Sequence, residues 1–366
     1  MIKFIPLDIY YEVFLYTSFA ITIITLFHAY VLDLNNRKNI NYITFIGYSL
    51  LILLTIYMGL RPVSGRYFID MATYARIYEG YAHGGEIILK TDIVFQQFMK
   101  FCSSFLSTNL FFLLCATLYI LPLYIVSKRF FQQYWFYAFF MFIVTMSFWT
   151  YGVNGIRNGI ATSFFLLAIA YYDKKSFMIT FFVIASLFHE SIYLPVGAFI
   201  LTLFIKDIKW YFIAWLMAIP LSFFLGGLFE NLFAGMGFVD DRLGDYLIGE
   251  KDAAFINSGF RFDFLFYSSF PILIGTYFIF KKKYNDVLYT QLFNIYLIAN
   301  AFWILIIRAN FSNRFAYLSW FLMPLLIIYP FIKNNSIKKQ HKIIGLVLFF
   351  YFLWTYFMYW YFESKK

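Results

Sequence analysis

Long apolar runs recur along the whole chain, and they limit the possible folds more than any other feature of the sequence. Each is close to the roughly 20 residues that an α-helix needs to cross about 30 Å of hydrocarbon. Segments of alternating apolar and polar residues, which would indicate the strands of a membrane barrel, are not seen. Charged residues make up only 13% of the chain, about half of what soluble domains contain. We therefore predict an all-α integral membrane protein.

The polar breaks between these runs predict about twelve transmembrane helices. Two long polar stretches, near 61–108 and 230–262, interrupt the series and are expected to form loops on the outer side. The pairs of spans that meet at 150–157 and at 189–190 could each instead form a re-entrant or a broken helix. No linker, low-complexity segment or repeat divides the chain, so we expect a single polytopic domain over 1–366. The expected spans lie near 9–31, 42–60, 109–126, 135–150, 157–172, 176–189, 190–205, 210–229, 263–281, 286–307, 315–332 and 343–361.

Lysines and arginines divide unevenly between the two sides of this arrangement. Short loops that alternate onto one side hold 13 lysines and 2 arginines, and the positive-inside rule makes that side cytoplasmic. The net charge of +10 therefore reflects orientation, and no nucleic-acid partner is expected. The other side holds most of the arginines, which are Arg61, Arg66, Arg76, Arg157, Arg242, Arg261, Arg308 and Arg314.

Arginines that gather at an outer membrane surface suit a lipid-linked phosphate or diphosphate. The guanidinium group is permanently charged, and its planar fork of N–H donors matches two phosphate oxygens at once. A second interpretation remains open for each arginine, which is that it pairs with a local acid or extends to the interface. The local acids in question are Asp70, Glu79, Glu190 and Asp263.

A His189-Glu190 pair lies between two apolar runs, at the same outer level as the arginines. A neutral histidine titrates close to operating pH and suits a general base, which Glu190 or Asp70 could orient or replace. Asp70 and Tyr74 share one face of a predicted helix by their i, i+4 spacing, with Arg66 one turn earlier. This face could hold a simple ion pair, or it could present a carboxylate and a phenol to a sugar.

Metal and cofactor sites are not expected. Asp240, Asp241 and Asp245 could together chelate a divalent cation, but the basic residues among them favour a solvated loop. Cys102 and Cys115 lie in or near apolar segments and are expected to be packing residues. Phosphate-binding, serine-nucleophile and zinc-helix motifs do not occur in the sequence.

Four polar motifs follow one another along the chain. They are an Arg-and-Gly stretch with D-x-x-x-Y (Arg61, Gly65, Asp70, Tyr74), a G-x-R element (Gly155, Arg157), "FHES" (His189) and "NRFAYL" (Arg314). Their order resembles that of the EpsG-like, Wzy-type polysaccharide polymerases of bacterial inner membranes. One departure, which concerns Asp70, is that "GRYFID" is longer than the compact G-x-D of the family.

The resemblance implies a GT-C-like membrane glycosyltransferase with its active site on the outer, periplasmic face of the inner membrane. It would join undecaprenyl-diphosphate-linked oligosaccharide repeat units into O-antigen, capsule or exopolysaccharide, without a metal, alongside a chain-length regulator and a flippase. The expected catalytic residues are His189, Asp70 and Glu190. The expected diphosphate- and sugar-binding residues are Arg157, Arg308, Arg314, Arg61, Arg66, Tyr74, Arg242 and Arg261.

Other functions remain open. An O-antigen ligase, or a glycosyltransferase that uses a lipid-monophosphate sugar, would need similar arginines. A flippase or transporter of lipid-linked sugar would need basic groups that are reachable from both sides, which the outward position of the arginines disfavours. A membrane acyltransferase would need a histidine in a more polar intramembrane context.

Overall fold

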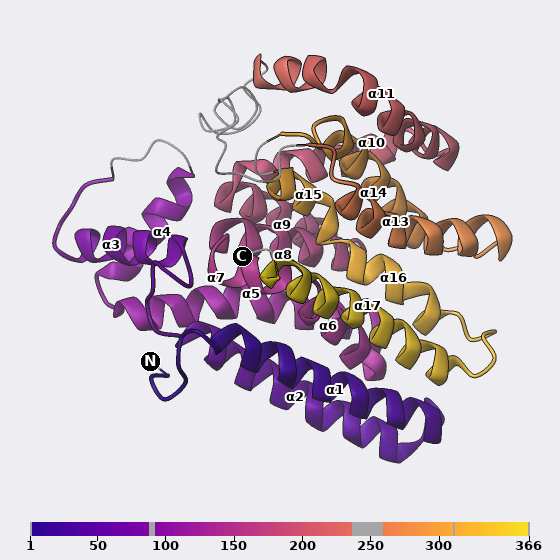
Figure 1. Cartoon of the computed structure of the whole chain (residues 1–366), viewed down its shortest axis with the longest axis horizontal. Helices are drawn as coiled ribbons and strands as arrows, with labels where there is room; N and C mark the ends of the chain where they lie inside the picture. The colour runs from indigo at the N-terminus through magenta and orange to yellow at the C-terminus, as the bar shows by residue number, and fades with distance from the viewer. Residues whose placement is uncertain (1, 88–91, 236–258, 310–311, 365–366) are drawn as a thin grey trace. The chain divides into compact units, whose positions relative to one another are not determined.

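The computed structural model describes residues 2–87, 92–235, 259–309 and 312–364, and within these residues it contains helices and no strands (Figure 1). The predicted all-α class is confirmed. The α-helices are α1 (Tyr10–Val31), α2 (Arg37–Gly59), α3 (Asp70–Ala82), α4 (Ile93–Ser103), α5 (Thr108–Phe131), α6 (Trp135–Ile143), α7 (Phe148–Val153), α8 (Ile156–Ala170), α9 (Lys175–Phe188), α10 (Tyr193–Phe204), α11 (Ile208–Gly235), α13 (Phe262–Thr276), α14 (Val287–Leu305), α15 (Ser312–Trp320), α16 (Met323–Lys333) and α17 (Gln340–Glu363).

Eight helical stretches of the described residues are long and apolar enough to cross a membrane. Three of the predicted spans are instead short apolar helices, Ile156–Ala170, Lys175–Phe188 and Glu190–Phe204. At 1.5 Å per residue such helices reach only about 20–25 Å, less than the hydrocarbon thickness. The predicted span 135–150 is also interrupted, because α6 and α7 are separate helices. The polytopic membrane class stands, with fewer full-length spans than the roughly twelve that the sequence predicts.

The chain divides into two compact units. Unit 1 comprises Met1–His189 with Phe331–Lys366, and unit 2 comprises Glu190–Pro330. The predicted single domain therefore remains a prediction, and the two units are described separately. The division falls between the two residues of the His189-Glu190 pair.

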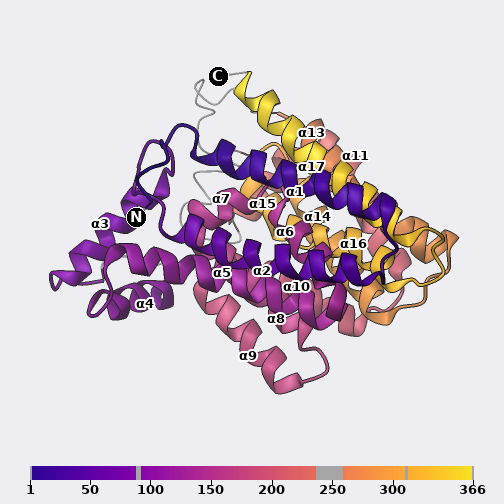
Figure 2. The ribbon, with the colours of Figure 1, turned by 90° about the horizontal axis from the view of Figure 1, so that it is seen from below.

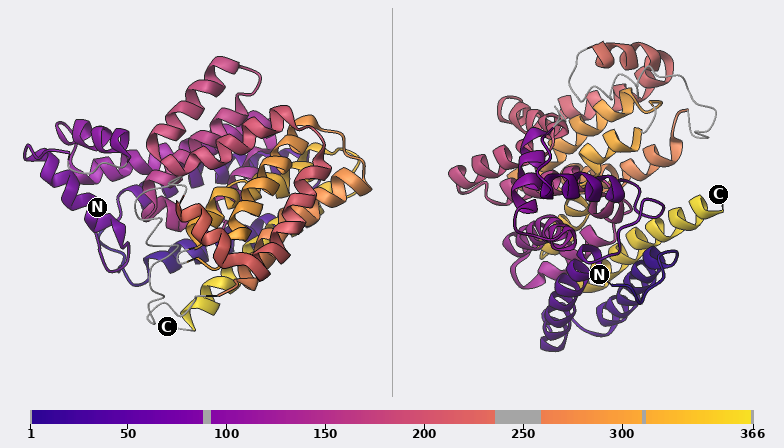
Figure 3. Two further views of the ribbon diagram at one scale, coloured as in Figure 1. Left: turned by 90° about the horizontal axis from the view of Figure 1, so that it is seen from above. Right: turned by 90° about the vertical axis from the view of Figure 1, so that its left-hand side faces the viewer.

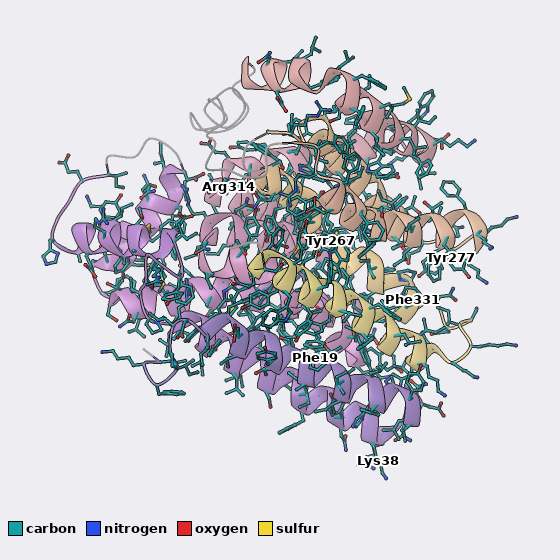
Figure 4. All side chains as sticks on the ribbon, in the orientation of Figure 1. Phe19, Lys38, Tyr267, Tyr277, Arg314 and Phe331 are labelled. Carbon is teal, nitrogen blue, oxygen red and sulfur yellow. The ribbon has the colours of Figure 1, made fainter. Side chains whose placement is uncertain are left out.

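In unit 1 the helices α1 and α17 lie side by side, as do α2 and α5 (Figure 2). Two sets of contacts join segments that lie next to lysine-bearing loops of this unit. Arg129, in the last turn of α5, donates to the Ala170 carbonyl at the end of α8 and to Asp173 in the turn that follows, each at 2.7 Å. His341, at the start of α17, lies 2.6 Å from the Leu32 carbonyl at the end of α1, near the α1–α2 connection where Figure 4 labels Lys38. The gathering of the lysine-bearing loops on one side, and the assignment of that side to the cytoplasm, remain predictions.

At the opposite end of α2, the predicted loop 61–108 contains two helices, α3 and α4, which lie beyond the ends of α1 and α2 (Figure 3). Each is amphipathic: α3 buries Met71, Ala75 and Tyr78, and α4 buries a similar stripe at i, i+4, i+7 spacing. The Tyr81 hydroxyl of α3 donates to Gln96 of α4 at 3.0 Å. The stretch thus contains the helix that the spacing of Asp70 and Tyr74 predicts and a second helix, α4, that was not predicted, and its polar residues form the exposed faces of these helices. Its position on the outer side remains a prediction.

Unit 2 is built around α14, which packs against α10, α11, α13 and α15. Buried polar side chains connect these helices. Trp215 of α11 donates to Asn300 of α14 at 2.8 Å, and Asn300 donates to Ser319 of α15 at 3.0 Å. Trp320 of α15 donates to Ser268 of α13 at 2.7 Å. Such interhelical hydrogen bonds are favoured in lipid, where water offers no alternative partner. The predicted loop near 230–262 lies mostly outside the described residues.

Candidate functional site

Arg157 is the second residue of α8 and occupies the centre of the candidate site in unit 1. Its Nη1 forms an ion pair with Asp92, and its Nε donates to the Tyr74 hydroxyl at 3.1 Å. The Arg157 and Asp92 side chains are only 15% and 5% exposed. The Gly155 of the G-x-R element is required locally, because a Cβ there would lie 2.7 Å from the Tyr151 ring. The tight turn after α7 thus places a largely buried guanidinium group between an acid and a phenol.

Asp92 is the site residue that sequence reasoning missed. It stands at the N-cap of α4 with a φ of +47°, in the left-handed region, and it is buried. The available signal was an aspartate directly before an apolar helical run, which indicates a helix start. Its partner Arg157 lies 65 residues further along the chain, so only the fold reveals the ion pair.

Tyr74 lies one turn after Asp70, on the predicted shared face of α3. Its hydroxyl accepts from Arg157, and among the described residues no acceptor receives its own proton. Burial raises the pKa of Tyr74; the Asp70 and Asp92 charges add to this increase, and Arg157 opposes it. The phenol therefore stays protonated at physiological pH and keeps an O–H donor beside the Arg157 cation.

His189 follows the last residue of α9 in extended conformation, with φ −157° and ψ 124°, and Glu190 opens a short 3-10 turn that leads into α10. The sequence left open a broken helix at this junction, and the structure contains that break. The ring of Phe188 lies 6.0 Å from Phe95 and 5.6 Å from Phe98 of α4. Phe95 also packs against Tyr74, at 6.0 Å. The end of α9 that carries His189 thus packs against the helix that begins at Asp92.

Arg61 is fully buried in the structure, and its expected role in binding the diphosphate or sugar remains a prediction. It donates to the backbone carbonyls of Met58 and Val153, and the rings of Phe68 and Phe112 lie 5.5 Å from its guanidinium carbon. Burial lowers the pKa of Arg61 to about 10. Val153 ends α7, just before the turn that leads to Arg157. Through its hydrogen bond to the Val153 carbonyl, Arg61 stabilises the turn that leads to Arg157.

In unit 2, Arg308 follows α14 and contacts α11. Its Nη2 donates to the Phe223 carbonyl at 2.9 Å, and its guanidinium carbon lies 5.6 Å from the Phe223 ring and 6.0 Å from the Phe260 ring. The helix α11 is interrupted at Leu225, where the backbone is non-helical. Arg308 packs beside this kink, next to Gly226, where an added Cβ would make only an ordinary van der Waals contact with Arg308 Cδ at 3.4 Å.

Arg261 in unit 2 pairs with a local acid, Asp263, which is one of the two alternatives that the sequence left open for each arginine. Its Nε and Nη2 donate to the two carboxylate oxygens of Asp263 at 2.9 and 2.6 Å, and it stacks 3.6 Å from the Phe264 ring. The planar fork of Arg261 is thus already used by a carboxylate at the start of its own helix, α13.

Of the remaining predicted arginines, Arg66 and Arg314 lie within the described residues. Arg66 is exposed and lies over the Tyr67 ring at 5.5 Å. Arg314 is exposed in the first turn of α15, where Figure 4 labels it. Arg242, together with the acidic loop of Asp240, Asp241 and Asp245, lies outside the described residues.

The described residues contain no group of three or more His, Cys, Asp or Glu side chains that could hold a metal ion. Cys102 and Cys115 are both buried and free, as expected for packing residues.

Comparison with known proteins gives one match. The model of the EpsG family matches residues 50–366, which is most of the chain and includes every candidate site residue. No curated protein and no solved structure matches the chain. Because the match extends from α2 to the C-terminal helix α17, the chain belongs to the EpsG family.

Proposed function

We propose that this protein is a membrane glycosyltransferase that polymerises undecaprenyl-diphosphate-linked oligosaccharide repeat units on the outer face of the bacterial inner membrane. Membership of the EpsG family supports a polysaccharide-polymerase role in general terms. The observation that carries the finer proposal is the Arg157 guanidinium, held by Tyr74 and Asp92 in a largely buried position.

The proposed reaction forms one bond and breaks another at the same carbon. A hydroxyl oxygen of one repeat unit attacks the anomeric carbon of the other, the bond from that carbon to the diphosphate oxygen breaks, and the lipid diphosphate leaves. Negative charge develops on the leaving oxygen, where preorganised donors in a poorly solvated site give a large share of catalysis. Arg157 supplies the fixed charge, and the Tyr74 hydroxyl supplies a neutral donor beside it.

The proton of the attacking hydroxyl requires an acceptor. His189 is the proposed general base, because a neutral imidazole suits that role near pH 7. Glu190 and Asp70 are the carboxylates proposed to orient the imidazole or to replace it. Arg308 and Arg314 are proposed as further diphosphate contacts, and since arginines provide the positive charge, the proposal needs no metal.

The test is polymer formation by the purified protein in lipid nanodiscs supplied with the lipid-linked repeat unit. We expect a ladder of products from the wild type, and a ladder reduced at least about 100-fold by Arg157→Lys, which keeps the charge but loses the fork. Arg261→Lys is the matched control, because the Arg261 fork is already occupied by Asp263. Its ladder should stay close to that of the wild type.

Three results would contradict the proposal. Normal chain lengths from Arg157→Lys would remove the clamp role of this arginine. Movement of substrate between leaflets without polymer would indicate a flippase. In cells that lack the gene, long chains that accumulate on the carrier lipid would indicate a ligase, whereas loss of a polymerase leaves single repeat units.

A further inference from the structure

We propose that Asp92 is a positioning residue for the transfer reaction, acting through Arg157. This inference rests on the proposed glycosyltransferase function and adds a residue to its machinery. The ion pair between the Asp92 carboxylate and Arg157 Nη1 is the central observation.

The first argument is that Asp92 does not serve its own helix. An aspartate at an N-cap usually accepts a hydrogen bond from the second or third amide of the helix, which stabilises the helix by about 1 kcal/mol. Asp92 occupies the N-cap of α4 and makes no such capping bond. Its carboxylate instead pairs with Arg157 of α8. Asp92 therefore does not stabilise the start of α4 by capping, and its carboxylate contacts α8 instead.

The second argument concerns burial. A buried carboxylate is costly unless a cation and hydrogen bonds compensate it, and removal of one partner leaves an uncompensated charge. Only 5% of the Asp92 side chain is exposed, so separation from Arg157 would leave a buried, uncompensated carboxylate. The backbone contributes to this, because the left-handed conformation at φ +47° fixes the direction in which the side chain leaves the chain.

The third argument is geometric. Arg157 is held at Nη1 by Asp92 from α4 and at Nε by Tyr74 from α3. Contacts at two nitrogens of one planar group fix its rotation as well as its position. The orientation of the guanidinium plane toward a diphosphate is therefore set by two helices that lie outside α8.

The charge of Asp92 has the opposite effect on binding of an anion. It partly neutralises Arg157 and so weakens the attraction for a diphosphate. At the same time it holds the guanidinium group in the orientation that the reaction requires. The inference is therefore specific about kinetics: removal of the charge should lower kcat and should not raise KM for the lipid diphosphate.

The variant Asp92→Asn tests this, because asparagine tolerates the left-handed conformation and retains the shape of the side chain. With purified protein in nanodiscs, we expect kcat to fall about 10- to 100-fold, as for a misplaced catalytic group, and KM to stay equal or fall. Asp263→Asn, which removes the acid from the Arg261 pair, is the matched control and should leave kcat unchanged. An unchanged kcat in Asp92→Asn would overturn the inference, as would an effect on KM alone.

Coupling separates positioning from a purely structural role. In the Arg157→Lys background, Asp92→Asn should cause no further loss of kcat, since the group that it positions is already lost. A further loss of the full 10- to 100-fold would overturn the inference. If Asp92→Asn fails to give folded protein, Asp92→Gly suits the same backbone conformation and takes its place.

Failure of this inference can be told apart from failure of the proposed function. If the wild type makes no polymer, the function is wrong. If the wild type makes polymer and Arg157→Lys does not, while Asp92→Asn behaves as the wild type, only the role of Asp92 is wrong.

Discussion

Arg157 in unit 1 and Arg261 in unit 2 both pair with a carboxylate, but the two carboxylates have different origins. Asp263 lies two residues from Arg261, and both of its oxygens accept from the guanidinium. Asp92 lies 65 residues from Arg157, and Tyr74 comes from a third helix. A pair of near neighbours can form wherever the local chain is ordered, whereas the Arg157 group exists only when α3, α4 and α8 are assembled. The difference indicates that the tertiary fold positions Arg157, whereas the local chain positions Arg261.

Arg308 represents a third arrangement. It is held by a carbonyl and two aromatic rings, without an acid among the partners that the described contacts give it. A carbonyl and two rings do not neutralise the charge of Arg308, so these contacts leave it suited to an anion. The three arginines therefore differ in what holds them. Arg157 is positioned by two other helices, Arg308 by a carbonyl and two rings, and Arg261 by an acid two residues away. The substitutions below test this difference.

The largest effect is expected at His189. We expect His189→Ala to lower polymer formation about 100- to 10,000-fold, the usual range for loss of a general base, in protein that remains folded and inserted. The measurement is the initial rate of ladder formation in nanodiscs. His83→Ala is the matched control, because His83 is exposed at the end of α3 with its Nδ1 beside the Glu79 carbonyl. A normal rate from His189→Ala would move the base to Asp70 or Glu190.

An intermediate effect is expected at Arg308. Arg308→Lys should lower kcat/KM about tenfold, equivalent to about 1.4 kcal/mol, because the lysine loses the charged fork and the ring contacts. Titration of the lipid diphosphate against the rate gives this value. Arg261→Lys in the same assay should change it little, and equal losses at both positions would remove the distinction between them.

The smallest effect on chemistry, and a clear effect on stability, is expected at Arg61. One lysine ammonium cannot reach both carbonyls that Arg61 contacts, so Arg61→Lys should lower the free energy of unfolding by about 1–3 kcal/mol. Thermal unfolding in detergent measures the change. The exposed Arg66→Lys should stay within about 0.5 kcal/mol of the wild type. If Arg61→Lys kept its stability and lost polymer formation, Arg61 would be the substrate contact that its sequence motif suggests.

The sequence predicted those parts of the molecule that depend on local pattern. Helix length and apolarity identified the membrane class, and the i, i+4 spacing of Asp70 and Tyr74 placed both on one face of α3. The Arg261–Asp263 pair was among the alternatives, since its members are neighbours. The burial of Arg61 and the role of Asp92 could not be predicted, because both depend on which distant carbonyl or guanidinium the fold brings within reach. The spacing of Asp70 and Tyr74 predicted α3, whereas α4 was not predicted, because its polar residues resemble those of a loop.

The left-handed backbone at Asp92 has a consequence for sequence variation. Two independent requirements meet at this position: the positive φ favours glycine, asparagine or aspartate, and the proposed contact with Arg157 requires a carboxylate. Glutamate meets the second requirement but not the first, and glycine and asparagine meet only the first. Aspartate alone meets both. In a survey of all 19 substitutions, asparagine and glycine should therefore be accepted for folding, and none should be accepted for polymer synthesis.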